Sequence, residues 1–495
     1  MEDASRHGGV KSVSTVKPSA SAFIIGALTR IAGQASLRRW LAGKLESHIH
    51  KVLVDEDSQN LRSVQEKKCE FVRAMLDSAV RNMENGRISR RVVSRLIEVL
   101  VKNCLLVESG VRRDQIRAFE AKYGQRPPNF IVLSPTQRCN LQCKGCYAGS
   151  TSETATTLPY DVVDRIVGEA HDIFGSRFVT VSGGEPFMYR DRGRTLMDIF
   201  RKYHDMFFLV YTNGTLITQQ MAEEMRELGN VTPAISVEGF EDETDQRRGE
   251  GTYRRVLDAF SNLRRSGVPF GVSVTSTDKN VDLLLTEDFY DFYFKEQGIS
   301  YMWQFQLMPI GRAQQVLDLM VAPEKRVRLY RMWERMLKEK KYCIADFWNS
   351  GVLSDGCIAY GRDGGYIYID WNGNITPCVF IPYYVDNVYD LYDAGDTIAE
   401  ALFSKFMENG RKWQREYGLD HRDEPGNWLM PCSIRDHYDF FRKSILPADA
   451  EPESSSSAEV LESDAFCEVL REYDQELSQL TAEIWNREYL NRLAS

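Results

Sequence analysis

The sequence predicts an α/β fold in which short apolar strands alternate with helices in the middle of the chain. Six runs have the composition of buried strands: 130–134, 177–182, 207–211, 232–237, 270–275 and 301–308. Helix-compatible segments separate several of them, at 160–174, 218–228, 251–266 and 281–297. This alternation indicates a parallel sheet joined by right-handed crossovers. Six strands are too few for a complete eight-stranded barrel, so we expect a partial one.

Length, charge and cysteine content limit the class of protein. A chain of 495 residues exceeds one ordinary core, so we expect about two to four domains. The net charge of −9 argues against a general nucleic-acid binder. Ten cysteines in this length do not form a secreted disulfide scaffold, so we expect a reducing cytoplasm. The apolar run at 20–28 is too short to span a bilayer and lacks a cleavage site typical of signal peptides.

The N-terminal segment has a basic, amphipathic character. Residues 1–18 are polar and are predicted to be disordered. Helical periodicity follows over 19–54, with apolar residues at Ile24, Leu28, Ile31, Leu37, Leu41 and Leu45. Residues 1–54 hold eight Lys or Arg against three Asp or Glu. Such a helix can lie on an anionic membrane, or it can pack its apolar stripe on the next domain.

The remaining composition suggests further boundaries. Residues 57–122 continue as helices, and Arg126-Pro127-Pro128 breaks the pattern. The segment 314–345 reads as helical, 447–458 as a linker and 460–493 as a final helix. The predicted divisions are 1–18, 19–126, 127–315, 316–446 and 447–495.

Three cysteines follow the first predicted strand at the spacing C-x3-C-x2-C. They are Cys139, Cys143 and Cys146. Soft thiolates select iron–sulfur clusters, zinc or Cu(I). Three ligands leave one metal position open, as in reactive sites, whereas closed four-ligand sites are usually structural. A zinc knuckle or three core thiols are the alternatives from spacing alone.

This triplet resembles the cluster motif of the radical S-adenosylmethionine (radical SAM) family. The resemblance implies a [4Fe-4S] cluster held by Cys139, Cys143 and Cys146, with one iron left for the methionine end of SAM. It also implies a partial (β/α)6 barrel, with the site at the carboxyl ends of the strands. One departure is Gly145, since the residue before the third cysteine is often aromatic in the family. The neighbouring Tyr147 is expected to contact the adenine.

Polar motifs at later strand ends extend the resemblance in the expected order. By analogy, Gly183-Gly184-Glu185 binds the amino group of SAM, Ser236 contacts its carboxylate or ribose with Glu238 nearby, and Arg248 binds its carboxylate. Pro309-Ile310-Gly311-Arg312-Ala313 resembles a motif that contacts the adenosine region. Each motif has a plainer alternative, namely an ordinary turn or, for Arg248, a solvated surface arginine.

A second cysteine group lies downstream, at Cys357, Cys378 and Cys432. Fifteen residues separate Cys357 from Gly373, and four more separate Gly373 from Cys378, around a predicted Asn372-Gly373 hairpin. This pattern resembles the SPASM domain or its shortened twitch form, a small α+β domain. The resemblance implies one auxiliary [4Fe-4S] cluster, whose fourth ligand would be Cys343, Asp436, His437 or an open iron. The alternative is a set of core thiols.

The resemblance implies a radical SAM oxidoreductase or transferase. In this family the reduced cluster splits SAM into methionine and a 5′-deoxyadenosyl radical, which removes hydrogen from an unactivated carbon. A flavodoxin- or ferredoxin-type donor supplies the electron. An auxiliary cluster takes the leftover electron or holds the substrate.

The substrate is left open by the sequence. The basic start of the chain favours a lipid or fatty-acyl substrate and peripheral contact of 19–54 with the inner face of the membrane. A ribosomal-peptide maturase of the SPASM type is one alternative, although the helical N-terminus lacks the expected peptide-binding module. A non-catalytic iron–sulfur electron carrier is the other.

Overall fold

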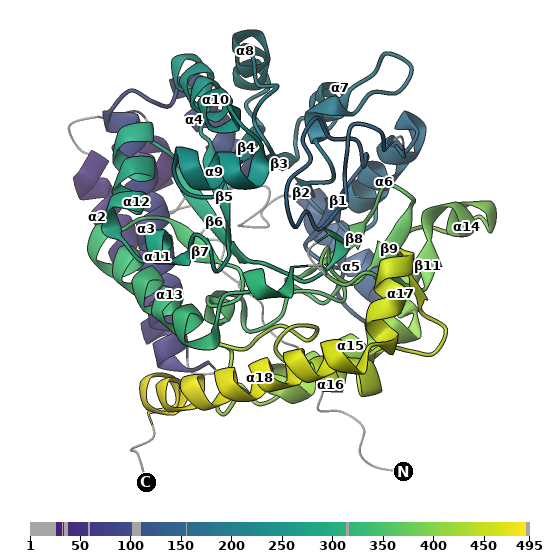
Figure 1. Ribbon diagram of the computed structural model, residues 1–495. Helices are drawn as coiled ribbons and strands as arrows, with labels where there is room; N and C mark the ends of the chain where they lie inside the picture. Colours follow the sequence, from purple (N-terminus) through teal and green to yellow (C-terminus); the bar gives the residue numbers. More distant parts are fainter. Residues whose placement is uncertain are drawn as a thin grey trace.

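The computed structural model describes residues 26–31, 33, 38–57, 60–100, 110–154, 156–312 and 316–491. All six predicted strands form, and each pairs in parallel with the next along the chain. They are β1 (Phe130–Leu133), β2 (Phe178–Val181), β3 (Phe207–Thr212), β4 (Val231–Val237), β5 (Gly271–Ser276) and β6 (Tyr301–Gln306). Figure 1 shows them arranged around the centre of the molecule, as in the predicted partial barrel.

The sheet extends beyond the predicted barrel at both edges. At one edge β7 (Ile344–Asp346) pairs in parallel with β6. At the other, β8 (Tyr366–Ile369) pairs in parallel with β1 and turns back into β9 (Asn374–Thr376), beside which β11 (Asp386–Asn387) lies. The Asn372-Gly373 hairpin therefore forms, but as part of the barrel sheet. The sheet runs across the division proposed at 315/316, and that division stays a prediction.

Helices cover the outside of this sheet (Figure 1). In chain order they are α6 (Tyr160–Asp172), η5 (Pro186–Met188), α7 (Leu196–Lys202), α8 (Gln219–Leu228), α9 (Glu241–Arg248), α10 (Thr252–Ser266), α11 (Val281–Leu284), α12 (Glu287–Asp291) and η6 (Phe292–Gln297). Local sequence explains their ends. In α8 the Thr218 hydroxyl accepts the Met221 N–H at the start, and Gly229 takes the left-handed conformation at the end.

Helical elements precede the barrel in the described chain, and the first and third of them pack together through the predicted apolar stripe. They are α2 (Arg38–His50), η3 (Lys51–Asp55), α3 (Arg62–Glu84), α4 (Arg90–Leu96) and α5 (Gly110–Tyr123). Ile31, Leu41 and Leu45 are buried in a cluster that also contains Val80 of α3. The structure therefore favours packing over membrane contact for the described part of 19–54; Ile24, Leu37 and residues 1–18 lie outside the described residues. In the described chain, no helix has the length and apolar character needed to cross a membrane.

After β6 the chain adds a mainly helical segment. Its first helical elements are η8 (Leu317–Leu319), α13 (Pro323–Arg335), η9 (Met336–Lys340) and η10 (Gly351–Ser354). Later come α14 (Val388–Asp393), η11 (Glu400–Phe403), α15 (Lys405–Gln414), η12 (Arg415–Leu419), α16 (Tyr438–Phe440) and η13 (Phe441–Ile445). The prediction of helix throughout 314–345 missed β7, because a three-residue strand leaves almost no periodic signal.

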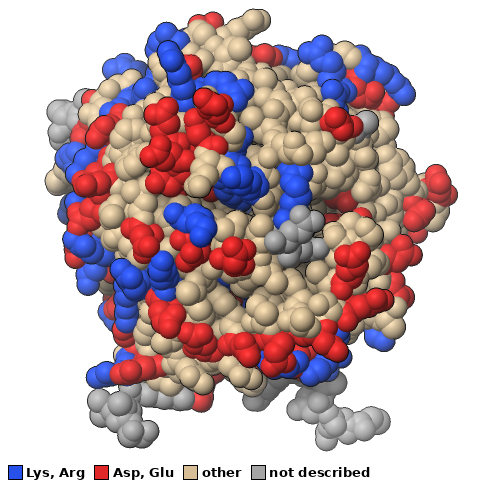
Figure 2. Space-filling view, in the orientation of Figure 1, with Lys and Arg blue, Asp and Glu red and all other residues tan. Residues whose placement is uncertain are grey.

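The C-terminal segment is more ordered than the predicted linker. Within 447–458, β12 (Glu451–Pro452) pairs with β10 (Tyr383–Tyr384), and α17 (Ser455–Glu462) begins. The predicted final helix is α18 (Asp464–Ile484), followed by η14 (Trp485–Tyr489). Figure 2 shows acidic side chains gathered along the lower edge of this face, where α18 lies.

Replacing Leu45 tests whether the apolar stripe stabilises the fold. Leu45 is 1% exposed, so Leu45→Ala should lower the free energy of unfolding by about 2–4 kcal/mol in anaerobic urea denaturation. The control is Trp40→Ala on the same helix, where a 61% exposed side chain should change stability by no more than about 0.5 kcal/mol. A harmless Leu45→Ala, together with binding to anionic liposomes that Trp40→Ala abolishes, would instead favour the membrane alternative.

Candidate active site

A cavity of about 1530 Å³ runs through the inside of the barrel. At the carboxyl edge of the sheet it is lined by Cys139, Cys143 and Cys146. At the amino edge it is lined by Phe130 and Tyr366, which are the first residues of β1 and β8. A ligand in this cavity can therefore reach from the first cysteine group to the opposite edge of the sheet.

The structure brings the three N-terminal cysteines together on the loop after β1. The pKa of Cys139 is raised to about 12, chiefly by burial; Glu185, Cys143 and Cys146 contribute to the rise, and the Leu141 N–H opposes it. Burial also raises the pKa of Cys143, while Arg248 opposes that rise. Thiols in a buried, partly cationic setting are suited to become thiolates when a metal centre binds, because the metal replaces the protons.

Two glycines after β2 hold this loop in place. Gly184 donates its N–H to Thr136 O at 2.9 Å, and Glu185 donates its N–H to Arg138 O at 2.7 Å. A Cβ on Gly183 would lie 2.6 Å from Thr136 O, and one on Gly184 would overlap the carbonyls of Gln137 and Arg138. The Gly-Gly pair therefore permits a close approach between two backbones, whereas the sequence suggested an approach to a ligand.

Arg312 braces the same loop from the other side. Its guanidinium donates to Cys143 O and, at 2.9 Å, to Ser150 O, and its backbone N–H donates to Cys146 O. A Cβ on Gly311 would overlap Tyr147 O. The sequence assigned this motif to adenosine contact and missed its bracing of the loop, because the contact joins segments far apart in the chain.

Glu185 is fully buried and strongly hydrogen-bonded. Its carboxylate accepts the Thr212 hydroxyl at 2.7 Å, the Asn213 N–H at 2.7 Å and the Phe187 N–H at 3.1 Å. Burial raises its pKa, and these donors oppose the rise. A carboxylate has about four acceptor positions, so one is left for a further donor such as an ammonium group.

Glu238 and two arginines form a buried charge cluster beside the cavity. Arg248 Nε and Arg247 Nη1 each lie 2.7 Å from Glu238 Oε1. Glu238 Oε2 is buried and has no hydrogen-bond partner in the described chain. Both arginines line the cavity, and each is paired with Glu238.

Tyr147 and Ser236 also line the cavity. The Tyr147 hydroxyl lies 2.7 Å from Ser182 Oγ, and its ring meets Phe380 edge to face at a centroid distance of 6.0 Å. Ser236 Oγ lies 3.3 Å from Ser273 Oγ. The structure thus gathers Cys139, Cys143, Cys146, Tyr147, Gly183, Gly184, Ser236 and Arg248 around one space, with Glu185 and Glu238 directly behind it.

The three downstream cysteines also come together, near the amino edge of the sheet. The pKa of Cys432 lies well above its usual range because of burial, with contributions from Asp436, Cys357 and Cys378. Cys378 Sγ lies 3.0 Å from the Tyr366 hydroxyl and accepts the Phe380 N–H at 3.5 Å. Gln414 donates to Cys357 O at 3.0 Å.

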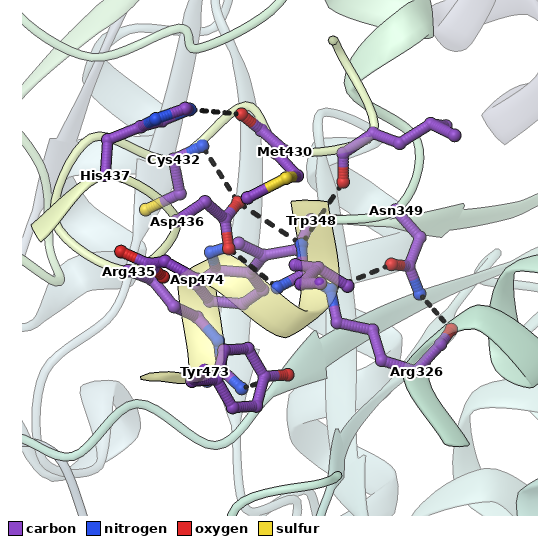
Figure 3. A network of polar contacts seen from close by, with 12 residues as sticks. Arg326, Trp348, Asn349, Met430, Cys432, Arg435, Asp436, His437, Tyr473 and Asp474 are labelled. Atoms are coloured by element: carbon purple, nitrogen blue, oxygen red, sulfur yellow. Dashed lines mark hydrogen bonds and ion pairs between the residues drawn. The ribbon is translucent and has the colours of Figure 1, made fainter. Parts of the chain in front are cut away.

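A buried network fixes the segment that carries Cys432 (Figure 3). Asp436 accepts the Cys432 N–H at 3.1 Å and pairs with Arg326 at 2.7 Å, both side chains being inaccessible to solvent. Arg435 donates to the Tyr473 hydroxyl at 3.1 Å, which ties the segment to α18.

Two of the three side chains suggested as a fourth ligand have other partners. Asp436 is held by Arg326, and His437 donates through Nε2 to Met430 O at 2.9 Å. Cys343 lies just before β7. Burial raises the pKa of its thiol to about 12, and the nearby Arg81 opposes that rise. These contacts count against Asp436 and His437, and they leave Cys343 and an open iron as the alternatives.

Thiol donors fit an iron–sulfur cluster at both places. Among the described residues, no three His, Cys, Asp or Glu side chains are close enough together for a single metal ion. A four-iron cluster is larger than one ion, so its thiolates stand farther apart. The donor chemistry and the glycine-lined loop thus suit a cluster.

Comparison with known families defines the class of protein. Residues 133–280 match the family described as the Radical SAM superfamily. The match runs from the end of β1 to the start of α11 and includes the three cysteines, the Gly-Gly-Glu motif and Arg248. Residues 133–280 therefore form a radical SAM domain.

Two relatives come from Methanosarcina barkeri. The AdoMet-dependent heme synthase is 27% identical over 290 residues, which cover 53% of this chain and 79% of the relative. The Fe-coproporphyrin III synthase is 28% identical over 195 residues, which cover 38% of this chain and 46% of the relative. Among solved structures, native anSMEcpe with bound AdoMet and Cp18Cys peptide superimposes with a TM-score of 0.48 at 17% identity, covering 70% of this chain and 99% of that one.

Replacing Gly184 tests the close backbone approach. Gly184→Ala places a methyl group against the carbonyls before Cys139, so the anaerobically reconstituted protein should lose the iron and sulfide of one cluster. The matched control is Gly43→Ala in α2, where the added methyl meets no atom within 4 Å and should leave the iron content unchanged. Full iron in Gly184→Ala would show that the loop tolerates the shift.

Proposed function

We propose that this protein binds a [4Fe-4S] cluster through Cys139, Cys143 and Cys146, together with SAM, and uses them to abstract hydrogen from a substrate held in the barrel cavity. The observation that carries the proposal is the convergence of three thiols and the strand-end motifs on one cavity. When bound and reduced, the cluster supplies the electron that cleaves SAM to a 5′-deoxyadenosyl radical.

The chain's own residues would bind and orient SAM. Glu185 has one acceptor position left for the ammonium group, and Arg248 presents a cation for the carboxylate. Ser236 offers a hydroxyl beside them, and the Tyr147 ring offers a surface for the adenine. The barrel walls would keep water from the reacting atoms, which protects a radical from side reactions.

The charges of the cavity favour an anionic substrate. Its lining contains eight Lys or Arg and four Asp or Glu, although the whole protein is acidic with a net charge of −9. Four of the basic residues gather towards the amino edge: Lys68, Arg126, Arg362 and Arg422. Lys68 and Arg126 are ion-paired there with Asp355 and Asp363, so the excess positive charge comes from Arg362 and Arg422. Arg362 donates to the carbonyls of Cys357 and Asp363, and Arg422 donates to Asn60 Oδ1.

We therefore place carboxylate-bearing organic molecules ahead of neutral acyl chains as substrates. Tetrapyrroles are the leading class, because the names of two relatives refer to heme and Fe-coproporphyrin III. The lipid alternative depended on a free amphipathic helix, and the stripe of α2 is occupied by α3. A second cluster at Cys357, Cys378 and Cys432, and a low-potential flavodoxin or ferredoxin donor, belong to the same proposal.

Product analysis tests the reaction. The reconstituted protein, reduced with dithionite under anaerobic conditions, should convert SAM to 5′-deoxyadenosine. The triple variant Cys139→Ala/Cys143→Ala/Cys146→Ala should form none, yet keep iron and sulfide for one cluster. Cys69→Ala, a buried thiol outside both groups, should behave like the parent. Absence of 5′-deoxyadenosine from the parent would leave the electron-carrier alternative.

Ligand titration tests the substrate class. Coproporphyrin III should bind the reconstituted protein, as measured by its absorbance shift, while its tetramethyl ester should bind more weakly because the carboxylates are masked. Arg422→Glu at the amino edge should weaken binding by about tenfold, and Arg255→Glu on the outer face of α10 should not. Binding of oleate in preference to the porphyrin would restore the lipid alternative, and indifference to Arg422→Glu would contradict the anionic site.

A further inference from the structure

The second cysteine group lies next to the cavity, but its cysteines do not line it. Among the described residues that line the cavity are all three cysteines of the first group and none of Cys357, Cys378 and Cys432. The chain neighbours Ile358 and Val379 do line it. The second group is thus adjacent to the cavity but turned away from it, although Cys357 and Cys432 are only partly buried.

Phe380 is the centre of the wall between them. Its ring lines the cavity and lies 5.1 Å from the Trp348 ring and 6.0 Å from the rings of Tyr147 and Phe347, measured between centroids. Its backbone N–H meanwhile donates to Cys378 Sγ on the other side. One residue therefore contacts the cavity through its ring and the second cysteine group through its backbone.

Tyr366 completes the wall in a similar way. It lines the cavity, and its hydroxyl lies 3.0 Å from Cys378 Sγ. Its ring stacks on Phe130 of β1, which fixes it in the sheet. The side chains between the two spaces are thus mainly apolar and aromatic, so they exclude water and polar ligands.

We propose that Phe380, with Ile358, Tyr366 and Val379, seals the second cysteine group from the cavity, so that the substrate packs against this aromatic wall and does not coordinate the auxiliary centre. The inference rests on the proposed cluster at Cys357, Cys378 and Cys432. The sequence left two roles open for the auxiliary cluster, which are to accept the leftover electron or to bind the substrate. Binding requires direct contact between substrate and cluster, whereas electron transfer does not, so the wall favours the electron acceptor. The wall also offers apolar and aromatic side chains to the substrate, in contrast to the basic residues at the amino edge.

Chelator access tests the seal. In the Cys139→Ala/Cys143→Ala/Cys146→Ala background, iron remains only at the second group. Its release to bathophenanthroline disulfonate under anaerobic conditions should be about tenfold faster after Phe380→Ala, because the truncation opens the wall. Phe380→Leu keeps apolar bulk and should release iron at nearly the parent rate.

Phe178→Ala is the matched control. Phe178 is also a half-buried phenylalanine lining the cavity, but it contacts Phe130 and Phe207 and lies outside the wall. It should release iron at the parent rate. Equal acceleration by Phe178→Ala, or a parent rate as fast as that of Phe380→Ala, would overturn the seal. A background protein without iron would refute the auxiliary cluster itself, while formation of 5′-deoxyadenosine by the unaltered protein would still support the first site.

A second measurement needs no wall variant. Imidazole coordinates an accessible iron, so the electron paramagnetic resonance spectrum of the reduced background protein should stay unchanged when imidazole is added. Altered g-values would show that an auxiliary iron is open to an added ligand, and the proposal would be wrong.

Discussion

The site depends on how the strand ends hold an irregular loop. The segment from Ser134 to Ser150 has no helix and no regular strand, so its own backbone hydrogen bonds cannot fix its shape. Gly184 and Glu185 donate to it from the end of β2, and Arg312 donates to it from the segment after β6. Three thiols can converge on one metal centre only if this loop keeps one conformation. The glycines matter here because any side chain at 183 or 184 would push the loop away.

Buried charge imposes a second constraint. A buried ionised group must be paired or hydrogen-bonded, because desolvation costs several kcal/mol, on the order of a whole domain's stability margin. The chain meets this requirement with Glu238 among two arginines at the first site and with Arg326 and Asp436 at the second. Both pairs also fix a functional segment, since Arg248 faces the cavity and Asp436 holds the Cys432 backbone. Removing one partner would leave a buried unpaired charge beside a cysteine group.

Much of the fold was predictable because its signals are local. Each of the six parallel strands is a short apolar run ending in polar residues, and the hairpin around Gly373 is set by Asn372-Gly373. The pairing of β8 with β1 was not predictable, since it joins segments more than 230 residues apart through apolar contacts that many partners could satisfy. For the same reason the 110-residue separation between Arg326 and Asp436 hid that ion pair from sequence reasoning. The spacing of the cysteines predicted the two groups. It could not predict that the first group lines the cavity and the second does not, because this depends on the packing of distant segments.

The orientation of the two groups links the fold to the chemistry. Cys139, Cys143 and Cys146 follow the carboxyl end of β1, whereas Cys378 lies beside Tyr366 at the amino end of β8. Because β1 and β8 are parallel neighbours, the two groups lie at opposite edges of one sheet, and the cavity runs between them. A substrate anchored by cations at the amino edge would place its far end towards the first group and its flank against Phe380. The extension of the sheet by β8 and β9 therefore does more than lengthen the barrel, since it brings the second group within one aromatic side chain of the space where the substrate would react.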